Sequence, residues 1–434
     1  MILLSVQTLF SVDSMFTRLW QAIGNIAPWQ RTLAIMFLAQ LITGVGFSSI
    51  FPFLPLYVNE LGSQMSLSVE FLAGAVFSAQ AITMMVASPI WGAVADRYGR
   101  KLMVQRAAFG GAVILLLMGF VRSAEELVLL RAIQGLITGV VSATNALVAA
   151  ATPRERSGYA MGMIQVALWS GIAVGPLIGG TIADVAGYRM TFVLTAVLLF
   201  VAGLLVFFGV NETFTPVARA QSGAITFLAD WQRLFHAPGV AITYSLRFLG
   251  DLARVIIIPI APLFILTLLP PTARVNTFTG LVVGLSAAAG TATAVYLGRL
   301  GDRVGHRRVL KVSALLAGIL FLPQALVTEA WQLLALQALT GAAGGGMTPA
   351  LSALLAGYTE PGEEGSVFGL DNSVAAASRA VAPLIGSGVA AWLGFRATFV
   401  TTGLVFLLVA LLALWRLPEV QGVSAADAVH ISEQ

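Results

Sequence analysis

The chain has 434 residues, of which 58% are hydrophobic and only 10% are charged, and its mean hydropathy is +0.89. Soluble domains carry about a quarter of their residues as Asp, Glu, Lys and Arg. This composition excludes a soluble globule of this size and predicts a protein whose main solvent is lipid. Cysteine is absent, which excludes disulfides and thiolate metal sites, and we predict neither a metal nor a cofactor.

The chain has a net charge of +4, which in a soluble protein would suggest a nucleic-acid partner. Here the bases gather in short loops between apolar runs, so topology explains them and no nucleic-acid partner is predicted. Alternate loops are rich in Lys and Arg, whereas the intervening loops hold little beyond Arg122, Arg189, Arg274 and Arg396. By the positive-inside rule, both termini and the middle loop lie in the cytoplasm. The prediction is a multi-pass protein of the inner (plasma) membrane.

Residues 1–30 are predicted to be an N-terminal cytoplasmic segment. They lack a basic n-region and a small-residue cleavage site, so they make a poor signal peptide. Two alternatives stay open: a weak interfacial helix through Phe16, Leu19, Trp20 and Ile23, or translation that begins at Met15.

Twelve apolar runs follow, each near the length of about 20 residues that a helix needs to cross a bilayer. They begin near Leu33, Leu72, Leu102, Leu127, Tyr159, Thr191, Val240, Thr277, Val309, Trp331, Val367 and Thr398. The predicted fold class is therefore an all-α membrane protein with twelve transmembrane helices.

A charged turn that occurs twice shows that these spans form two similar sets. The segment from Gly92 to Lys101 follows the second span, and a close copy from Gly298 to Arg308 follows the eighth. Prolines repeat in the same way, with Pro52 and Pro55 in the first span and Pro259 and Pro262 in the seventh. Such a tandem repeat is typical of a rocking transporter. It predicts two pseudo-symmetric six-helix halves, residues 31–211 and 239–416, with a cytoplasmic linker at 212–238 that includes a short surface helix at 227–234, and a tail at 417–434.

Three motifs resemble the signatures of the major facilitator superfamily, in particular its 12-span drug:proton antiporters. They are the charged turn, the set Arg131, Gln134 and Gly135, and the fifth-span series Gly162, Gly171, Gly175, Pro176, Gly179 and Gly180. The resemblance covers roughly residues 31–416. Segments 52–58 and 88–92 resemble the MdtG-type bacterial multidrug efflux proteins in particular.

The charged turn carries the first functional prediction. Asp96 can cap the N-terminus of a neighbouring helix, because exposed N–H groups there favour an anion. The resemblance implies a conformational latch made of Gly92, Asp96, Gly99, Arg100 and Lys101, with Asp302 in the second copy. The alternative is a positive-inside anchor with a tight glycine turn.

The other two motifs carry further predictions. A charge inside a span costs at least about 2.5–3.5 kcal/mol on insertion scales, so Arg131 should face a cavity or a partner. The resemblance gives it a role in proton transfer by biasing a nearby acid; the alternative is a structural arginine near the cytoplasmic end of its helix.

The fifth-span glycines leave one helix face bare, so that a second helix can approach closely. The resemblance makes that partner the eleventh span, in an outer seal; the alternative is packing alone.

Candidate proton carriers lie in the second half. Arg247, Asp251 and Arg254 share one stripe of the seventh span, and Asp371 in the eleventh span has Arg379 two turns further on. Desolvation raises the pKa of a buried carboxyl group and adjacent arginines lower it, which makes either acid a plausible proton carrier. The alternative is neutralising ion pairs without a transport role.

The first six spans hold no mid-membrane acid, unlike many drug:proton antiporters. This disfavours cationic drugs that need a deep carboxylate and favours neutral or amphipathic substrates. Gln40 occupies the place that Arg247 has in the second half. The predicted cavity candidates are Gln40, Gln134, Asn145, Gln165, Trp169 and Arg247, although Trp169 could equally face lipid.

Two functions are compatible with these features. The first is proton-coupled export of amphipathic small molecules by alternating access, and the alternative is transport of a defined metabolite such as a sugar, an organic anion or a lipid-like compound. An enzyme is not predicted, since neither H-E-x-x-H nor G-x-x-x-x-G-K occurs. The predicted partners are the lipid bilayer, a small-molecule substrate and protons, and the protein is predicted to be a monomer.

Overall fold

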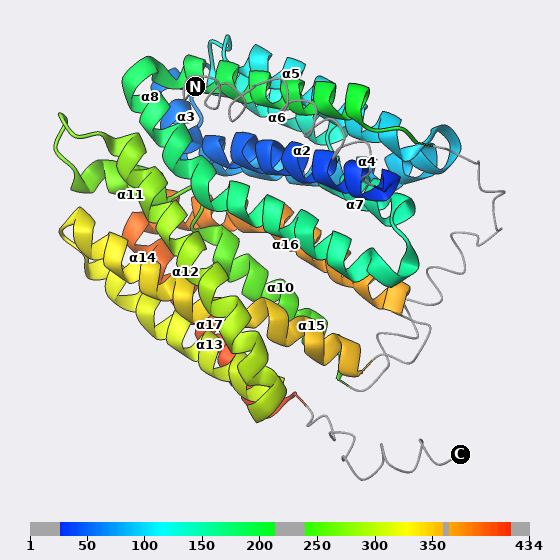
Figure 1. Ribbon diagram of the computed structural model, residues 1–434. Helices are drawn as coiled ribbons and strands as arrows, with labels where there is room; N and C mark the ends of the chain where they lie inside the picture. Colours follow the sequence, from blue (N-terminus) through cyan, green and yellow to red (C-terminus); the bar gives the residue numbers. More distant parts are fainter. Residues whose placement is uncertain (1–26, 213–238, 359–363, 418–434) are drawn as a thin grey trace, which may run out of the picture.

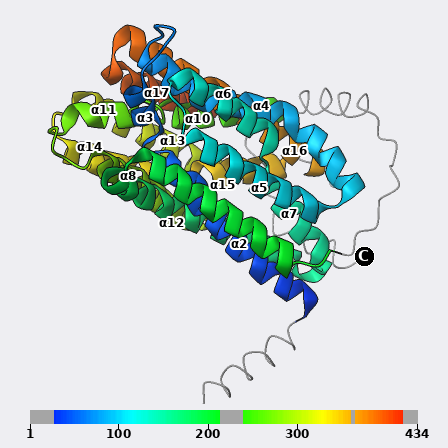
Figure 2. The same cartoon turned by 90° about the horizontal axis from the view of Figure 1, so that it is seen from above.

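The computed structural model describes residues 27–212, 239–358 and 364–417, which form helices and short turns and contain no strand. The helices run roughly side by side and form two groups, one from each half of the sequence (Figures 1 and 2). Most of the predicted N-terminal segment and of the tail, and the predicted surface helix at 227–234, lie outside the described residues.

The first half is built from seven α-helices and one 3-10 turn. These are α2 (Pro28–Ile50), α3 (Leu54–Leu61), α4 (Val69–Tyr98), α5 (Arg100–Met118), α6 (Ala124–Ile137), α7 (Val140–Ala151), η1 (Arg154–Arg156) and α8 (Ser157–Gly209). The backbone of α8 is interrupted at Gly187, where φ is 83°, so that α8 contains the predicted fifth and sixth spans.

The second half repeats this order. Its elements are α10 (Val240–Ile256), α11 (Ala261–Leu268), α12 (Val275–Val304), α13 (His306–Phe321), η2 (Leu322–Leu326), α14 (Ala330–Gly344), α15 (Met347–Gly357), α16 (Glu364–Leu393) and α17 (Phe395–Trp415). The repeat extends to details, because α3 and α11 each have 8 residues and α4 and α12 each have 30. The predicted pair of pseudo-symmetric halves is confirmed.

Glycines make the equivalent sharp turns in both halves. Gly99 separates α4 from α5 and Gly305 separates α12 from α13, the second and third spans of each half, with φ of 98° and 92°. Gly187 and Gly394 do the same between the last two spans of each half, at 83° and 85°. Positive φ is costly for any residue with a Cβ atom, so these four positions require glycine.

The first and fourth spans of each half are broken into two helices. The breaks in the first spans, at 51–53 and 257–260, contain Pro52 and Pro259, which cannot donate the backbone hydrogen bond that a helix needs. The fourth spans break at Gly139, with φ of 132°, and at Gly345–Gly346. Counting each broken pair as one crossing and α8 as two, the described helices are consistent with the twelve predicted spans.

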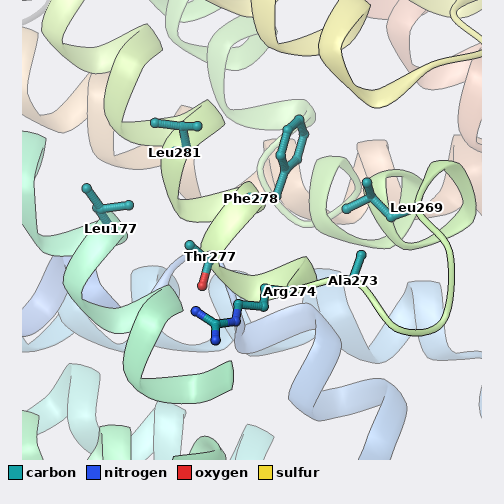
Figure 3. A pocket seen from close by; sticks show the side chains of 7 residues that line it. All are labelled: Leu177, Leu269, Ala273, Arg274, Thr277, Phe278 and Leu281. Atoms are coloured by element: carbon teal, nitrogen blue, oxygen red, sulfur yellow. The ribbon is translucent and has the colours of Figure 1, made fainter. Parts of the chain in front are cut away.

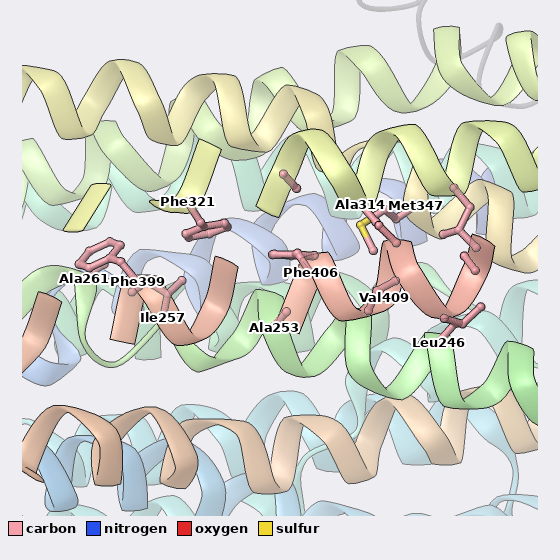
Figure 4. Packing of buried hydrophobic residues seen from close by; sticks show 14 of the residues in the cluster. Leu246, Ala253, Ile257, Ala261, Ala314, Phe321, Met347, Phe399, Phe406 and Val409 are labelled. Atoms are coloured by element: carbon pink, nitrogen blue, oxygen red, sulfur yellow. The ribbon is translucent and has the colours of Figure 1, made fainter. Parts of the chain in front are cut away.

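Each half has its own apolar core. In the second half Phe321 stacks on Phe406 with ring centroids 5.5 Å apart, inside a cluster of buried residues that runs from Leu246 to Leu417 (Figure 4). In the first half Phe53 meets Phe192 edge to face at 5.4 Å. Lipid tails are as apolar as these side chains, so close packing rather than escape from water stabilises such cores.

The halves meet mainly along two helix pairs, α8 with α12 and α4 with α16, and α3 makes a smaller contact with α11. The contacts concentrate at the ends away from the charged turns. In α12 the buried residues lie between Asn276 and Gly284, apart from Gly301, and none between Leu285 and Leu300 is buried. The two halves are therefore closed at one end, which we call the outer end, and part toward the charged turns.

Candidate transport site

A buried charge cluster lies between α10 and α16. The Nε atom of Arg247 is 3.4 Å from Oδ2 of Asp251 and 3.3 Å from Oδ1 of Asp371. Exposure of these three residues is 9%, 8% and 6%, respectively. The cluster brings together two predicted proton carriers and one predicted cavity residue, from spans that are far apart in the sequence.

The two other predicted bases lie beside this cluster. Arg254 donates to Oγ1 of Thr348 on α15 over 3.3 Å, and it interacts electrostatically with Asp251, Arg247 and Arg379. Both Arg254 and Arg379 are exposed. Since a guanidinium facing hydrocarbon is costly, we infer that both face a water-filled space between the halves.

The matching place in the first half is uncharged. Gln40 on α2 is 1% exposed, and neither of its amide atoms has a hydrogen-bond partner among the described residues. Asn145 on α7 has an unpartnered buried Oδ1 atom as well. A buried polar group without a partner destabilises the structure by about 1–3 kcal/mol, and we infer that a bound water or a substrate supplies the missing hydrogen bonds.

Arg131 is held by neutral groups. Its Nη1 donates to Oε1 of Gln134 over 2.8 Å and its Nε donates to the Val76 carbonyl over 3.2 Å, and it is 2% exposed. No described carboxylate forms a salt bridge with it. These contacts favour the structural alternative, in which Arg131 ties α6 to α4. Its predicted place was wrong, because Arg131 lies in the second turn of α6, toward the outer end of the span.

The fifth-span glycines pack closely, but not against the predicted partner. A Cβ atom on Gly171, Gly175 or Gly179 would overlap α2, at Leu41 to Val45, Ser48 and Ser49 respectively. On Gly180 it would overlap the Asn276 carbonyl of α12. The series therefore closes α8 onto the first span and, at one glycine, onto the eighth, whereas the eleventh span (α16) packs on α4.

The start of the fifth span is open. A Cβ atom on Gly162 would meet nothing within 4 Å, and Gln165 and Trp169 are exposed. Gly162 thus takes no part in the close packing that the motif predicts for it. This end of α8 points toward the charged turns, where the halves part.

Asp184 at the outer end joins the two halves. Its Oδ1 accepts from the backbone N (3.2 Å) and Nδ2 (2.7 Å) of Asn276, and its Oδ2 accepts from the backbone N of Thr277 (2.6 Å). An acid of α8 therefore caps the N-terminus of α12 across the interface, where free N–H groups and the helix dipole favour a negative charge. The sequence indicated only a boundary residue, because a cap between distant segments has no local signature.

We expect Asp184→Ala to weaken outer closure. Loss of a charge-assisted cap costs about 1–2 kcal/mol, which corresponds to roughly a tenfold change in the ratio of closed to open molecules. Because the chain has no cysteine, spin labels can be placed at Met65→Cys and Leu326→Cys, two exposed outer-end positions of opposite halves. The distance distribution between the labels should broaden to longer values, and an unchanged distribution would contradict this role. Glu126→Ala, which removes an outer acid that hydrogen-bonds only within the first half, is the control.

At the charged turns the capping acid is Glu212. Its carboxylate accepts from the backbone N atoms of Arg100 (3.0 Å) and Lys101 (2.8 Å) at the start of α5. Lys101 Nζ donates to the Phe207 carbonyl, and the equivalent Arg307 donates to the Leu414 carbonyl.

The structure describes only part of the predicted latch. The side chain of Asp96 lies outside the described residues, and a Cβ atom on Gly92 would meet nothing within 4 Å. Asp302 pairs with His306 of its own turn at 3.2 Å. The latch role of this turn therefore stays a prediction.

A duplicated helical bundle with broken central spans and a buried charge cluster between its helices defines a membrane transporter. Comparison with known families agrees: the model of the Major Facilitator Superfamily matches residues 36–269 and 243–430, and the chain belongs to this family. The predicted resemblance is confirmed.

Similar proteins narrow the assignment. The chain is 35% identical to the multidrug resistance protein MdtG of Salmonella dublin over 379 residues, which cover 87% of this chain and 93% of that protein. It is 36% identical to MdtG of Dickeya zeae over 380 residues, which cover 88% and 93%.

Solved structures share the fold at low identity. A variant of the nucleoside transporter NupG has a TM-score of 0.76 at 14% identity, covering 89% of this chain and all of that chain. The D-xylose–proton symporter has a TM-score of 0.72 at 16% identity, covering 91% and 99%.

Proposed function

We propose that this protein is a proton-coupled antiporter that exports amphipathic small molecules across the bacterial inner membrane. The observation that carries the coupling is the Arg247–Asp251–Asp371 cluster, and the MdtG relatives support the substrate class. We also propose that both termini lie in the cytoplasm and that the protein acts as a monomer. The substrate is moved without chemical change, and no cofactor takes part.

Charge balance explains why this cluster suits proton exchange. One guanidinium cannot neutralise two carboxylates, and like charges in a poorly solvated site disfavour each other. Adding one proton to the pair of acids completes the balance of the three salt-bridged groups. Removing it leaves an excess negative charge within that set, because the neighbouring Arg254 and Arg379 are exposed and water screens their charge. The two acids act as one coupled pair, so the proton belongs to the pair rather than to either residue.

The closed outer end supplies the second part of the mechanism. In the arrangement observed, the path is closed at Asp184 and Gly180 and parts toward the charged turns, which corresponds to an inward-facing state. A proton leaves the cluster on this side and a substrate enters; the halves then rock, so that the substrate leaves and a proton returns on the outer side.

Uncharged polar groups on one side and charges on the other favour amphipathic substrates. Gln40 and the Oδ1 atom of Asn145 have no hydrogen-bond partner among the described residues, and the three charged residues of the cluster belong to the second half. A neutral or weakly polar substrate can hydrogen-bond to the first half without competing for the carboxylates. This arrangement accounts for coupling without a deep acid in the first six spans.

A defined anionic metabolite is the second candidate. Three arginines, Arg247, Arg254 and Arg379, lie in the same region as only two carboxylates, and Arg254 and Arg379 form no salt bridge among the described residues. An organic anion would find a guanidinium there.

One transport assay separates these candidates. Purified protein in proteoliposomes is offered a panel of amphipathic dyes and a panel of sugars and organic anions, with internal pH recorded by a fluorescent indicator. We expect several dyes to move, each with a substrate-dependent proton flux in the opposite direction. Transport of a single metabolite with no dye movement would establish the second candidate instead.

A further inference from the structure

A pocket of about 290 Å³ lies at the outer junction of the two halves (Figure 3). Leu177 of α8 forms one wall, and Leu269, Ala273, Arg274, Thr277, Phe278 and Leu281, from the end of α11 to the second turn of α12, form the rest. Leu177 and Leu281 are 40% and 39% exposed on helices that are long and apolar enough to span a membrane. The pocket therefore opens to the lipid and is separate from the charge cluster of α10 and α16.

Two polar groups converge at this pocket. Arg274 immediately precedes α12, its side chain is exposed, and it forms no salt bridge among the described residues. The Thr277 hydroxyl is buried and has no hydrogen-bond partner there, and Figure 3 shows the two groups facing one another. No residue that lines the pocket carries a negative charge.

From this arrangement we propose that the pocket binds one anionic phospholipid of the outer leaflet. The Arg274 guanidinium suits a phosphate oxygen pair, which it can bind in a bidentate manner, and the Thr277 hydroxyl supplies a further donor. An acyl chain then runs over Leu177, Phe278 and Leu281. The volume of the pocket is at the lower end of the roughly 300–1,000 Å³ range of small-molecule sites, which is enough for part of a lipid.

Because no acid lines the pocket, it favours a lipid whose headgroup carries no positive charge. An ethanolamine or choline group would bring a positive charge beside Arg274 with no lining carboxylate to receive it. Asp184, the nearest acid along α8, already accepts three hydrogen bonds from Asn276 and Thr277. A glycerol headgroup adds no positive charge beside Arg274, so phosphatidylglycerol is the lipid with which we test this site.

Binding here is coupled to the conformational state. The walls come from both halves, and the Thr277 backbone N is itself held by Asp184 across the interface. Opening the outer end would separate Leu177 from Leu281 and take the pocket apart. A lipid that binds only the closed arrangement shifts the equilibrium toward it, so phosphatidylglycerol stabilises the inward-facing state.

Native mass spectrometry of the full-length protein tests the site directly. The protein is released from nanodiscs that contain phosphatidylcholine and phosphatidylglycerol, and retained lipids are counted. We expect one preferentially retained phosphatidylglycerol in the wild type and a several-fold loss of that preference in Arg274→Gln. Leu177→Trp, which fills the pocket without changing charge, should lose the retained lipid whichever headgroup it carries. Arg122→Gln, at an exposed arginine before α6, should bind as the wild type does.

The conformational arm uses the labels at Met65→Cys and Leu326→Cys. Phosphatidylglycerol should narrow the outer-end distance distribution in the wild type and in Arg122→Gln, but not in Arg274→Gln. Equal lipid retention by the wild type, Arg274→Gln and Leu177→Trp would overturn the proposal, as would displacement of the lipid by transported dyes, which would make the pocket a substrate site. Neither readout depends on transport, so the lipid site and the transport proposal fail independently.

Discussion

Asp371→Asn is expected to uncouple export from the proton gradient. The substitution keeps the shape of the side chain but removes one of the two carboxylates that share Arg247, so the remaining groups balance without a proton. A coupling free energy of about 1–3 kcal/mol corresponds to roughly a 5- to 150-fold change in an equilibrium ratio. We therefore expect the accumulation of substrate against its gradient to decrease by roughly 5- to 150-fold. Downhill equilibration of the same dye should continue. Dye flux and internal pH, recorded together in proteoliposomes, measure both quantities.

The rate of export should depend on the pH outside the membrane only when the two acids are intact. In the wild type, acidifying the outer side should speed export, because it loads the proton that returns inward. In Asp371→Asn, and in Asp251→Asn, this acceleration should disappear. Glu155→Gln, at an exposed acid of η1, is the charge-matched control and should behave like the wild type. If both aspartate variants export against a gradient as well as the wild type does, the cluster is a neutralising ion-pair set without a coupling role.

Two glycines of the same motif are expected to behave in opposite ways. In Gly180→Ala the new methyl group overlaps the Asn276 carbonyl across the interface, and overpacking of this kind costs about 1–3 kcal/mol. This penalty falls only on the closed outer end, so molecules should shift toward the outward-open state. Transport should fall severely, because the inward-facing state is then rarely reached. Gly162→Ala adds the same methyl group where nothing lies within 4 Å and should leave transport unchanged.

Distances between labels at Met65→Cys and Leu326→Cys check the cause. They should lengthen in Gly180→Ala and stay unchanged in Gly162→Ala. Gly179→Ala is a useful third variant, because its methyl group overlaps Ser49 within the first half; it should lower thermal stability rather than shift the distances. A normal distance distribution in Gly180→Ala would show that this glycine is not part of the outer closure.

Much of the architecture follows from local properties of the sequence. Apolar runs of membrane-crossing length, positive-φ turns that need Gly99 and Gly305, and proline breaks near Pro52 and Pro259 are each encoded within a few residues. The repeat of these signals shows the duplication. The stripe of Arg247 and Asp251 is likewise local, because both lie on one helix at a spacing of one turn.

The partners of these residues depend on the tertiary structure. Nothing in the sequence favours Asp371 over Arg254 as the partner of Arg247, and the resemblance assigned the fifth-span glycines to the wrong helix. Asp184 and Glu212 accept hydrogen bonds from backbone N–H groups 92 and 112 residues away, and no local pattern shows such a cap.

By itself, the sequence determined that this is a duplicated twelve-span membrane protein whose mid-membrane acids lie in its second half, since hydropathy, glycine turns and proline breaks act over short distances. Only the tertiary structure decided which acid shares Arg247, which glycine touches the opposite half, and where a lipid-facing pocket forms. Those features arise where segments remote in the chain come together, and the free energy of such contacts depends on atomic positions that no single segment fixes.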